Sequence, residues 1–313
     1  MTQLLCPKAI VTGATGFIGS RLVAALERHG YRIAAMTRGD VSSAGGAAVD
    51  WYSLDEPGNA AFDDASVLFH LAGRAHIIRE HAANPEAEFR AANVDLTIRM
   101  AEWAADSGVR RFVFLSSIAA LGSKTAPGSH FSELTIPAPE TDYGKSKLMA
   151  EVALTSLGQA TGMEIVIVRP PMVYGPGAKG NFARMMALLK LGMPLPFGAT
   201  DNRRSFVGVG NLTDFLIRCA EHPHAAGQTF LVSDDQDIST TDFLRMSAEA
   251  LGLRPFLIPV PKRFLQYAAK VAHKEALIDK LVGDLRIDCS RAKSVLSWQP
   301  SLSIRDGLRS TTS

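Results

Sequence analysis

The chain has 313 residues, of which 47% are hydrophobic and 20% charged, a composition typical of a globular protein that can bury a full core. Its net charge of +2 provides no strong overall field for nucleic acid or an anionic membrane, and no window approaches the roughly 18 apolar residues of a membrane span. Three widely separated cysteines exclude a disulfide framework and suit the reducing cytoplasm, and no histidine motif indicates a metal.

An apolar, β-branched run followed by three evenly spaced glycines begins the chain. Residues 9–12 suit a buried parallel strand, and the residues after the glycines place apolar side chains at helical spacing. Glycine lets the backbone approach a pyrophosphate closely, and the free N–H groups at a helix start attract that anion. We therefore predict a dinucleotide site rather than an ordinary turn, with contacts from Gly13, Thr15, Gly16, Phe17, Ile18 and Gly19.

The second predicted strand, residues 31–36, is followed by Arg38. In dinucleotide folds an acid at this point bonds the ribose 2′-OH of NAD, whereas an arginine accommodates the 2′-phosphate of NADP. Arg38 therefore favours NADP(H), with NAD(H) as the alternative. A solvated loop arginine without a ligand would give the same pattern.

Further buried strands over residues 66–71, 111–115, 164–168 and 229–232 alternate with helices, one of them predicted over 93–107. This alternation predicts the α/β class, a doubly wound parallel (Rossmann) sheet with its ligand crevice at the carboxyl ends of the strands. At one such end we expect cofactor contacts from Leu71, Ala72 and Gly73, because the small residues after Leu71 let the cofactor pass close to the backbone. We expect residues 1–170, with a returning segment 204–232, to form the dinucleotide-binding domain, and 171–203 with 233–313 to form a smaller substrate lobe.

Tyr143 and Lys147 lie four residues apart on a predicted helix and so share one face. A neighbouring ammonium and a positive nicotinamide ring favour phenolate and would lower the tyrosine pKa from about 10. Tyr143 could then exchange a proton with an alcohol oxygen while hydride moves to or from the ring, and Lys147 would hold the nicotinamide ribose. Ser117, at the end of strand 111–115, is predicted to bond the substrate oxygen, with Ser116 as the alternative.

The motifs TGATGFIG, HLAG, YGKSK and RPPMVYGPG, in this order, resemble the extended short-chain dehydrogenase/reductases, and most closely their nucleotide-sugar epimerase, dehydratase and 4-ketoreductase group. The resemblance implies that Asp50 bonds the adenine amino group and that Asn93 contacts the cofactor. It also implies a homodimer that pairs through helices around 93–107 and 143–157. The substrate contacts that we assign are Arg74, Ser117, Asn181 and Arg204.

Two features narrow the expected reaction. Ile118-Ala119 stands where sugar 4,6-dehydratases of this group carry an Asp-Glu pair, which disfavours water elimination. Arg38 points to exchangeable NADPH and so to a reductase. We predict oxidoreduction at C4 of a UDP-linked sugar, with a 4-ketoreductase favoured over a 4-epimerase, in surface polysaccharide synthesis. The alternatives are a reductase of non-nucleotide ketones and a non-enzymatic dinucleotide sensor, which would not need the Tyr143–Lys147 pair.

Overall fold

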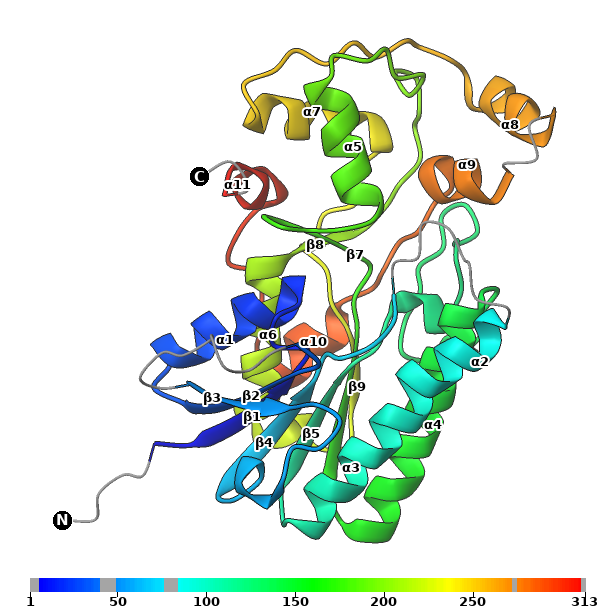
Figure 1. Cartoon of the computed structure of the whole chain (residues 1–313). Helices are drawn as coiled ribbons and strands as arrows, with labels where there is room; N and C mark the ends of the chain where they lie inside the picture. The colour runs from blue at the N-terminus through cyan, green and yellow to red at the C-terminus, as the bar shows by residue number, and fades with distance from the viewer. Residues whose placement is uncertain (1–5, 40–48, 76–83, 272–274, 311–313) are drawn as a thin grey trace.

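A seven-stranded, all-parallel sheet forms the centre of the larger part of the chain (Figure 1). The computed structural model describes residues 6–39, 49–75, 84–271 and 275–310. The strand order β3-β2-β1-β4-β5-β6-β9 reverses direction of winding between β1 and β4, which is where a doubly wound sheet forms its ligand crevice. The predicted fold class is confirmed. The strands are β1 (Lys8–Thr12), β2 (Arg32–Thr37), β3 (Val49–Ser53), β4 (Ala65–His70), β5 (Arg111–Leu115), β6 (Glu164–Arg169) and β9 (Thr229–Leu231).

Helices cover both faces of the sheet (Figure 1). Successive side chains of a strand point to opposite faces, so Val11 of β1 belongs to one buried cluster and Ile10 to the other. The cluster of Val11 is completed by α1 (Phe17–Arg28), α6 (Val209–Glu221) and α10 (Ser290–Leu296). The cluster of Ile10 is completed by α3 (Leu96–Asp106) and α4 (Asp142–Thr161).

The helix predicted over 93–107 begins earlier and is interrupted. The Asn84 side chain accepts a hydrogen bond from the N–H of Ala87, and Pro85 occupies the first turn, so α2 (Pro85–Arg90) starts there. A π-helical turn, Ala91–Asp95, then leads into α3. Asn93 lies inside this turn and does not open a helix, so that expectation was wrong.

A smaller, mainly helical part lies above the carboxyl ends of the strands (Figure 1). Its two-stranded parallel sheet joins β7 (Met172–Tyr174) to β8 (Phe206–Gly208), and the Phe206 ring of β8 stacks on the Phe243 ring with their centres 4.2 Å apart. The division into two domains stays a prediction. Its described helices are α5 (Asn181–Lys190), α7 (Thr240–Ala250), α8 (Lys262–Val271), α9 (Glu275–Val282) and α11 (Ile304–Arg309). The described residues of the whole chain also form 3-10 turns at Asn59–Ala61, Ile118–Ala120 and Pro223–Ala225.

One segment near the C-terminus joins the two parts by backbone hydrogen bonds. The N–H of Phe131, in the loop that follows β5, donates to Arg286 at 2.8 Å. The N–H of Ser205, in the smaller part, donates to the adjacent Leu285 at 2.8 Å. Residues 284–288 therefore fix these two loops relative to each other. Within the described ranges, no helix is long and apolar enough to span a bilayer.

The histidine at the end of β4 is fully buried and has partners on both ring nitrogens. His70 Nδ1 lies 2.9 Å from Thr12 Oγ1, and Nε2 lies 3.0 Å from Thr97 Oγ1. Thr97 donates its own proton to the Asn93 carbonyl, so it accepts from Nε2–H. Burial, together with the Lys147 charge, lowers the pKa of His70 to about 3. His70 is thus a neutral core residue.

This shift makes stability depend on pH. Unfolded His70 takes up a proton below about pH 6.5 whereas the folded form does not, so its stabilising contribution is full above that pH and is lost on acidification. At pH 5 we expect this group to reduce the free energy of unfolding by about 2 kcal/mol. Urea unfolding at pH 7.5 and pH 5 measures the difference. His70→Gln should show a smaller dependence, and an equal dependence would contradict the assignment.

Candidate active site

The turn between β1 and α1 is built from glycines that no other residue could replace without a shift. Gly13 adopts a φ of +68°, in the left-handed region. A Cβ on Gly19 would lie 2.1 Å from the Gly13 carbonyl oxygen, which itself accepts a hydrogen bond from the N–H of Gly16 at 2.9 Å. The first turn of α1 contains no acidic residue and no side-chain cap. Its free N–H groups and close backbone fit a dinucleotide pyrophosphate.

A cavity of about 550 Å³ opens from this turn and extends up to the smaller part of the chain. Its wall combines the glycine turn, the ends of β4 and β5, the start of α4, and residues of β7, β8 and α9. The volume is that of a site for small molecules and cofactors. The predicted residues in its wall are Gly13, Gly16, Phe17, Ile18, Gly19, Leu71, Gly73, Arg74, Ser117, Tyr143, Lys147 and Arg204.

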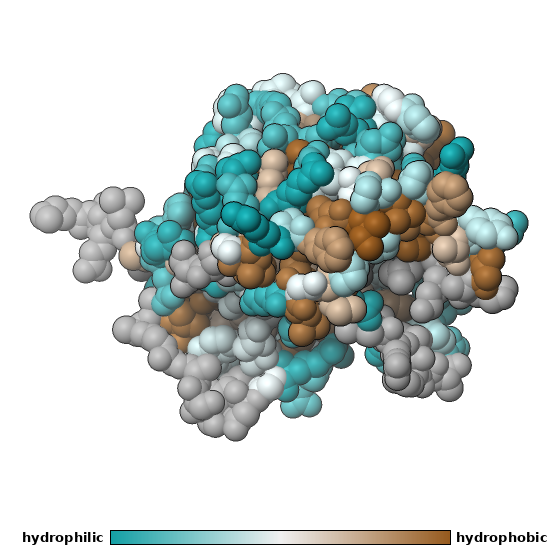
Figure 2. All heavy atoms as spheres, turned by 90° about the horizontal axis from the view of Figure 1, so that it is seen from above, coloured by the Kyte–Doolittle hydropathy of each residue, from teal (hydrophilic) through white to brown (hydrophobic). Residues whose placement is uncertain are grey.

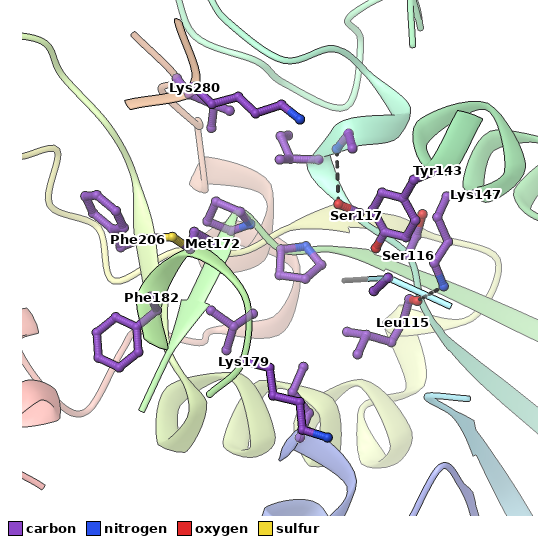
Figure 3. Close-up of a pocket in the computed structure, with 18 of the residues that line it drawn as sticks. Leu115, Ser116, Ser117, Tyr143, Lys147, Met172, Lys179, Phe182, Phe206 and Lys280 are labelled. Atoms are coloured by element: carbon purple, nitrogen blue, oxygen red, sulfur yellow. Dashed lines mark hydrogen bonds between the residues drawn. The ribbon is translucent and has the colours of Figure 1, made fainter. Parts of the chain in front are cut away.

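Three of these residues, Ser117, Tyr143 and Lys147, lie next to one another in the cavity (Figure 3). Lys147 Nζ donates to the carbonyl of Leu115 at 2.8 Å and lies 4.5 Å from the ring centre of Phe114. Burial lowers the pKa of Lys147 to about 8, and Glu151 opposes that shift. The ammonium form still prevails at neutral pH, so Lys147 can donate hydrogen bonds to a ligand.

The surroundings of Tyr143 shift its pKa upward. Burial raises the pKa above that of free tyrosine, and the hydrogen bond with the Ser117 side chain opposes the rise only in part. The protein groups alone therefore raise the pKa of Tyr143, because desolvation dominates, and the lowering by Lys147 together with the nicotinamide ring stays a prediction. Tyr143 is held as a neutral phenol, the form that can give a proton to an oxygen.

The two serines at the end of β5 point to different partners. Ser116 donates to the carboxylate of Glu151, which is buried and forms an ion pair with Arg169, 2.5 Å between Nη2 and Oε2. Ser117 instead faces Tyr143 and accepts from the N–H of Ala119 at 3.2 Å (Figure 3). Ser116 thus completes a buried charge network, and Ser117 is the one available to a substrate.

Ser117→Ala is expected to reduce kcat by roughly 10²-fold because a donor to the reacting oxygen is lost. Ser116→Ala should instead lower the free energy of unfolding by about 1–3 kcal/mol, since Glu151 loses a buried partner. Steady-state kinetics and urea unfolding of both variants separate the two effects. The opposite pattern would reverse the assignment.

Asn93, which the resemblance assigns to cofactor binding, is not among the described residues of the cavity wall. Its Oδ1 accepts from the N–H of Arg74 at 2.7 Å, and its Nδ2 donates to the Arg74 carbonyl at 3.0 Å and to Ser146 Oγ at 2.9 Å. A Cβ on Gly73 would approach Oδ1 within 2.8 Å. Asn93 is buried and its side-chain atoms are paired, so it joins the β4 loop to α4, and its contact with the cofactor stays a prediction.

The assignment of Asp50 to the adenine site does not fit its position in the sheet. Asp50 is the second residue of β3 and lies opposite Ala34 of β2 in the sheet. Its carboxylate favours the charged form of Lys8, which lies at the amino end of β1. The crevice lies at the opposite, carboxyl end of these parallel strands. The sequence could not locate Asp50 because it did not fix where this weak strand begins.

The remaining predicted residues surround the cofactor end of the crevice or lie outside the described atoms. Arg38 follows β2 with its side chain 58% exposed and Nε 3.9 Å from Asp55. Thr15 Oγ1 lies 3.1 Å from Thr37 Oγ1, and the N–H of Ala72 donates to Thr12 behind the glycine turn. Asn181 begins α5, but its side chain lies outside the described part of the structure.

Sequence reasoning missed two lysines that point into the cavity, Lys179 and Lys280 (Figure 3). Lys179 follows β7 in an irregular segment and Lys280 lies in α9, so neither belongs to a motif. Among the described residues of the wall, Glu140 is the one carboxylate. An excess of cations over carboxylates suits a phosphorylated ligand. The wall's cations are Arg74, Lys147, Lys179, Arg204 and Lys280.

Arg204 is the member of the Arg203-Arg204 pair that reaches the cavity. Its Nη1 donates to the carbonyl of Gly283 at 2.9 Å, while Arg203 is exposed. Burial lowers the pKa of Arg204 to about 10, which keeps the guanidinium charged at neutral pH. The side chain is thus a cation in the cavity wall that is held by a backbone carbonyl.

Comparison with known proteins shows the family of the chain. The profile of the NAD dependent epimerase/dehydratase family matches residues 9–233. A UDP-glucose 4-epimerase of Vibrio cholerae is 40% identical over 314 residues, which cover 97% of this chain and 94% of the relative.

Two solved structures have the same fold. A UDP-glucuronic acid 4-epimerase from Bacillus cereus in complex with NAD has a TM-score of 0.78 at 21% identity, covering 97% of this chain and 95% of that one. RMD from Pseudomonas aeruginosa complexed with NADPH has a TM-score of 0.73 at 22% identity, covering 98% and 97%. The predicted resemblance is confirmed: the chain belongs to the NAD dependent epimerase/dehydratase family and is an enzyme of the extended short-chain dehydrogenase/reductase type.

Proposed function

We propose that the protein transfers hydride between NADP(H) or NAD(H) and C4 of a UDP-linked sugar. The observation that carries this proposal is the juxtaposition of Ser117, Tyr143 and Lys147 in the cavity that opens from the glycine turn. The cations of the same wall, with Arg204 foremost, suit the diphosphate of a nucleotide sugar. The relative from Vibrio cholerae bears the name of a nucleotide-sugar enzyme, which supports the same substrate class.

The residues of the chain divide the work of such a reaction. The glycine turn would hold the pyrophosphate, and Lys147 the nicotinamide ribose. When bound, the nicotinamide ring supplies or accepts the hydride. Tyr143 would donate its phenolic proton to the C4 oxygen as the ketone becomes an alcohol, and would recover it in the reverse direction. Ser117 would bond that oxygen and fix its position.

Within this proposal we favour reduction of a 4-keto sugar. The neutral phenol of Tyr143 is the proton donor that a reduction needs. Arg38 directly follows β2, and an arginine after the second strand of such folds commonly accommodates the NADP 2′-phosphate, which supports NADP(H). Epimerisation at C4 is the second candidate, because the Vibrio cholerae relative is a UDP-glucose 4-epimerase.

Two assays separate the candidates. The first supplies a UDP-4-keto-hexosamine with NADPH, and the second supplies UDP-N-acetylglucosamine without added cofactor. Turnover of the first alone identifies a reductase, and interconversion of the second identifies an epimerase. Turnover of a small apolar ketone with no activity on any nucleotide sugar would overturn the proposal.

Arg38→Ala should weaken NADPH binding about tenfold, through the loss of a charge-assisted contact, and leave NADH binding nearly unchanged. Fluorescence titration with both cofactors measures the ratio. Arg32→Ala is the matched control, because Arg32 is an exposed arginine at the other end of the same strand. Equal losses for NADPH and NADH would contradict a role for Arg38 in cofactor choice.

We also propose that the enzyme serves surface polysaccharide synthesis. A further proposal is that two copies of the chain form a dimer through α3 and α4. Met149 and Val152 on α4 are 43% and 61% exposed, which provides an apolar face for such a contact. Light scattering of the purified protein tests the mass. A monomer at micromolar concentration would exclude this pairing.

A further inference from the structure

The smaller part of the chain carries two long segments without a carboxylate. Between Glu249 and Glu275 the sequence contains no Asp or Glu but includes Arg254, Lys262, Arg263, Lys270 and Lys274. Between residues 170 and 200 it again contains none but includes Lys179, Arg184 and Lys190. The net charge of the whole chain, +2, conceals this local excess of positive charge.

Helix α8 lies within the first of these segments and has two apolar stripes instead of one. Leu265 and Ala269 are buried against the protein. Phe264, Tyr267 and Val271 follow the i, i+3, i+7 spacing of a second stripe, and they are 54%, 71% and 68% exposed. Packing against the protein itself uses only the buried stripe of α8. The second has no described partner within this chain.

Arg263 and Lys270 lie seven residues apart, so they form a row beside the exposed stripe of α8. The guanidinium of Arg263 is 5.1 Å from the ring centre of Phe264. Aromatic and aliphatic side chains flanked by long cations on one helix face are the composition of helices that lie in a membrane interface.

Further exposed apolar side chains lie on the segments that precede α8 and follow α5. The segment before α8 lies beside the one after α5, since the N–H of Leu195 donates to Phe256 and that of Ile258 donates to Leu195. Phe256 is 62% exposed, and Leu191 and Met193 are 73% and 49% exposed. Figure 2 looks down on this end of the molecule, where hydrophobic residues gather among hydrophilic ones.

We propose that this surface docks on an anionic lipid bilayer. We define it by its exposed apolar residues (Leu191, Met193, Phe256, Ile258, Phe264, Tyr267 and Val271) and its cations (Lys190, Arg254, Arg263 and Lys270) and call it the basic-apolar surface. The cations complement phosphate headgroups, and the rings can enter the acyl boundary. A polar nucleic acid would leave the rings exposed, and a second copy of the chain would bring like charges together.

Docking of this kind is separate from the reaction. None of the described α8 residues is in the cavity wall, whose nearest contribution comes from Lys280 and Leu281 of α9. The basic-apolar surface would therefore determine where the enzyme works. If the docking proposal failed, the proposed reaction would be unaffected.

The test is co-flotation of the full-length protein with vesicles of phosphatidylcholine, with and without phosphatidylglycerol, at low and high salt. Wild-type protein should float with the anionic vesicles and be released by salt. Arg263→Glu/Lys270→Glu should reduce the partition coefficient at least about 25-fold, at about fivefold for each cation lost. Phe264→Ser/Tyr267→Ser should reduce it more than about tenfold through lost apolar burial.

Leu134→Ser/Ile136→Ser is the matched control, because these side chains are 89% and 86% exposed but lie between Glu133 and Glu140. This variant should float like the wild type, and all variants should keep the wild-type circular dichroism and turnover. The proposal is overturned if the wild type ignores anionic vesicles or if Phe264→Ser/Tyr267→Ser floats equally well. A halved mass of that variant by light scattering, without vesicle binding by the wild type, would identify a second copy as the occupant instead.

Discussion

Replacing Tyr143 with phenylalanine is expected to reduce kcat by roughly 10²–10⁴-fold, the usual contribution of a general acid or base. The substitution removes a single oxygen from a ring that packs 6.1 Å from Phe89, centre to centre, so the fold should not change. Cofactor affinity should stay near the wild-type value, because the glycine turn and Lys147 remain. Single-turnover hydride transfer, followed by absorbance at the nicotinamide band, measures the chemical step directly.

Tyr52→Phe is the control for this substitution. Tyr52 is half-buried in β3 and lies outside the described cavity wall, so its loss should leave kcat unchanged. If Tyr143→Phe retained wild-type turnover, another group would have to protonate the C4 oxygen, and Ser117 would be the first alternative to examine.

Gly19→Ala has the second large expected effect. The new methyl would lie 2.1 Å from the Gly13 carbonyl oxygen, a backbone atom that cannot rotate away, so α1 must move from the turn. We expect the cofactor dissociation constant to rise more than about 100-fold, because the pyrophosphate loses several positioned N–H donors at once. Isothermal titration with NADPH and NADH measures the loss.

Gly39→Ala is the matched substitution near the same end of the site. The nearest atom to its added methyl would be Thr37 Oγ1 at 3.7 Å, an ordinary contact distance, so cofactor binding should be preserved. Cofactor binding by Gly19→Ala at the wild-type level would show that the pyrophosphate does not depend on this turn. A rise of the same size in both variants would point to a general effect on the β1–β2 region instead.

The sequence was sufficient for features that local physics determines. The apolar runs that became β1, β4, β5 and β6 are continuous because both faces of a parallel sheet are covered, and the glycine turn has a pattern of its own. The four-residue spacing of Tyr143 and Lys147 placed both on one face of α4. These features establish the sheet and the position of its crevice.

Features that depend on tertiary packing could not be predicted in the same way. The π-helical turn around Asn93 depends on hydrogen bonds to Arg74 and Ser146, which are distant in sequence. The raised pKa of Tyr143 is due to burial, which a motif does not report. Lys280 reaches the cavity only because the C-terminal segment folds back over the loop after β5.

Residues 284–288 bear on whether a shortened chain can form a complete site. Residues 1–170 contain nearly every recognisable motif. The backbone N–H groups of Phe131 and Ser205, however, donate to Arg286 and Leu285, which follow the first motif cluster by more than a hundred positions. A shortened chain that ends before residues 284–288 would keep the motifs of its family but would lose part of the cavity wall. For such fragments, motif content is a poor guide to catalytic competence.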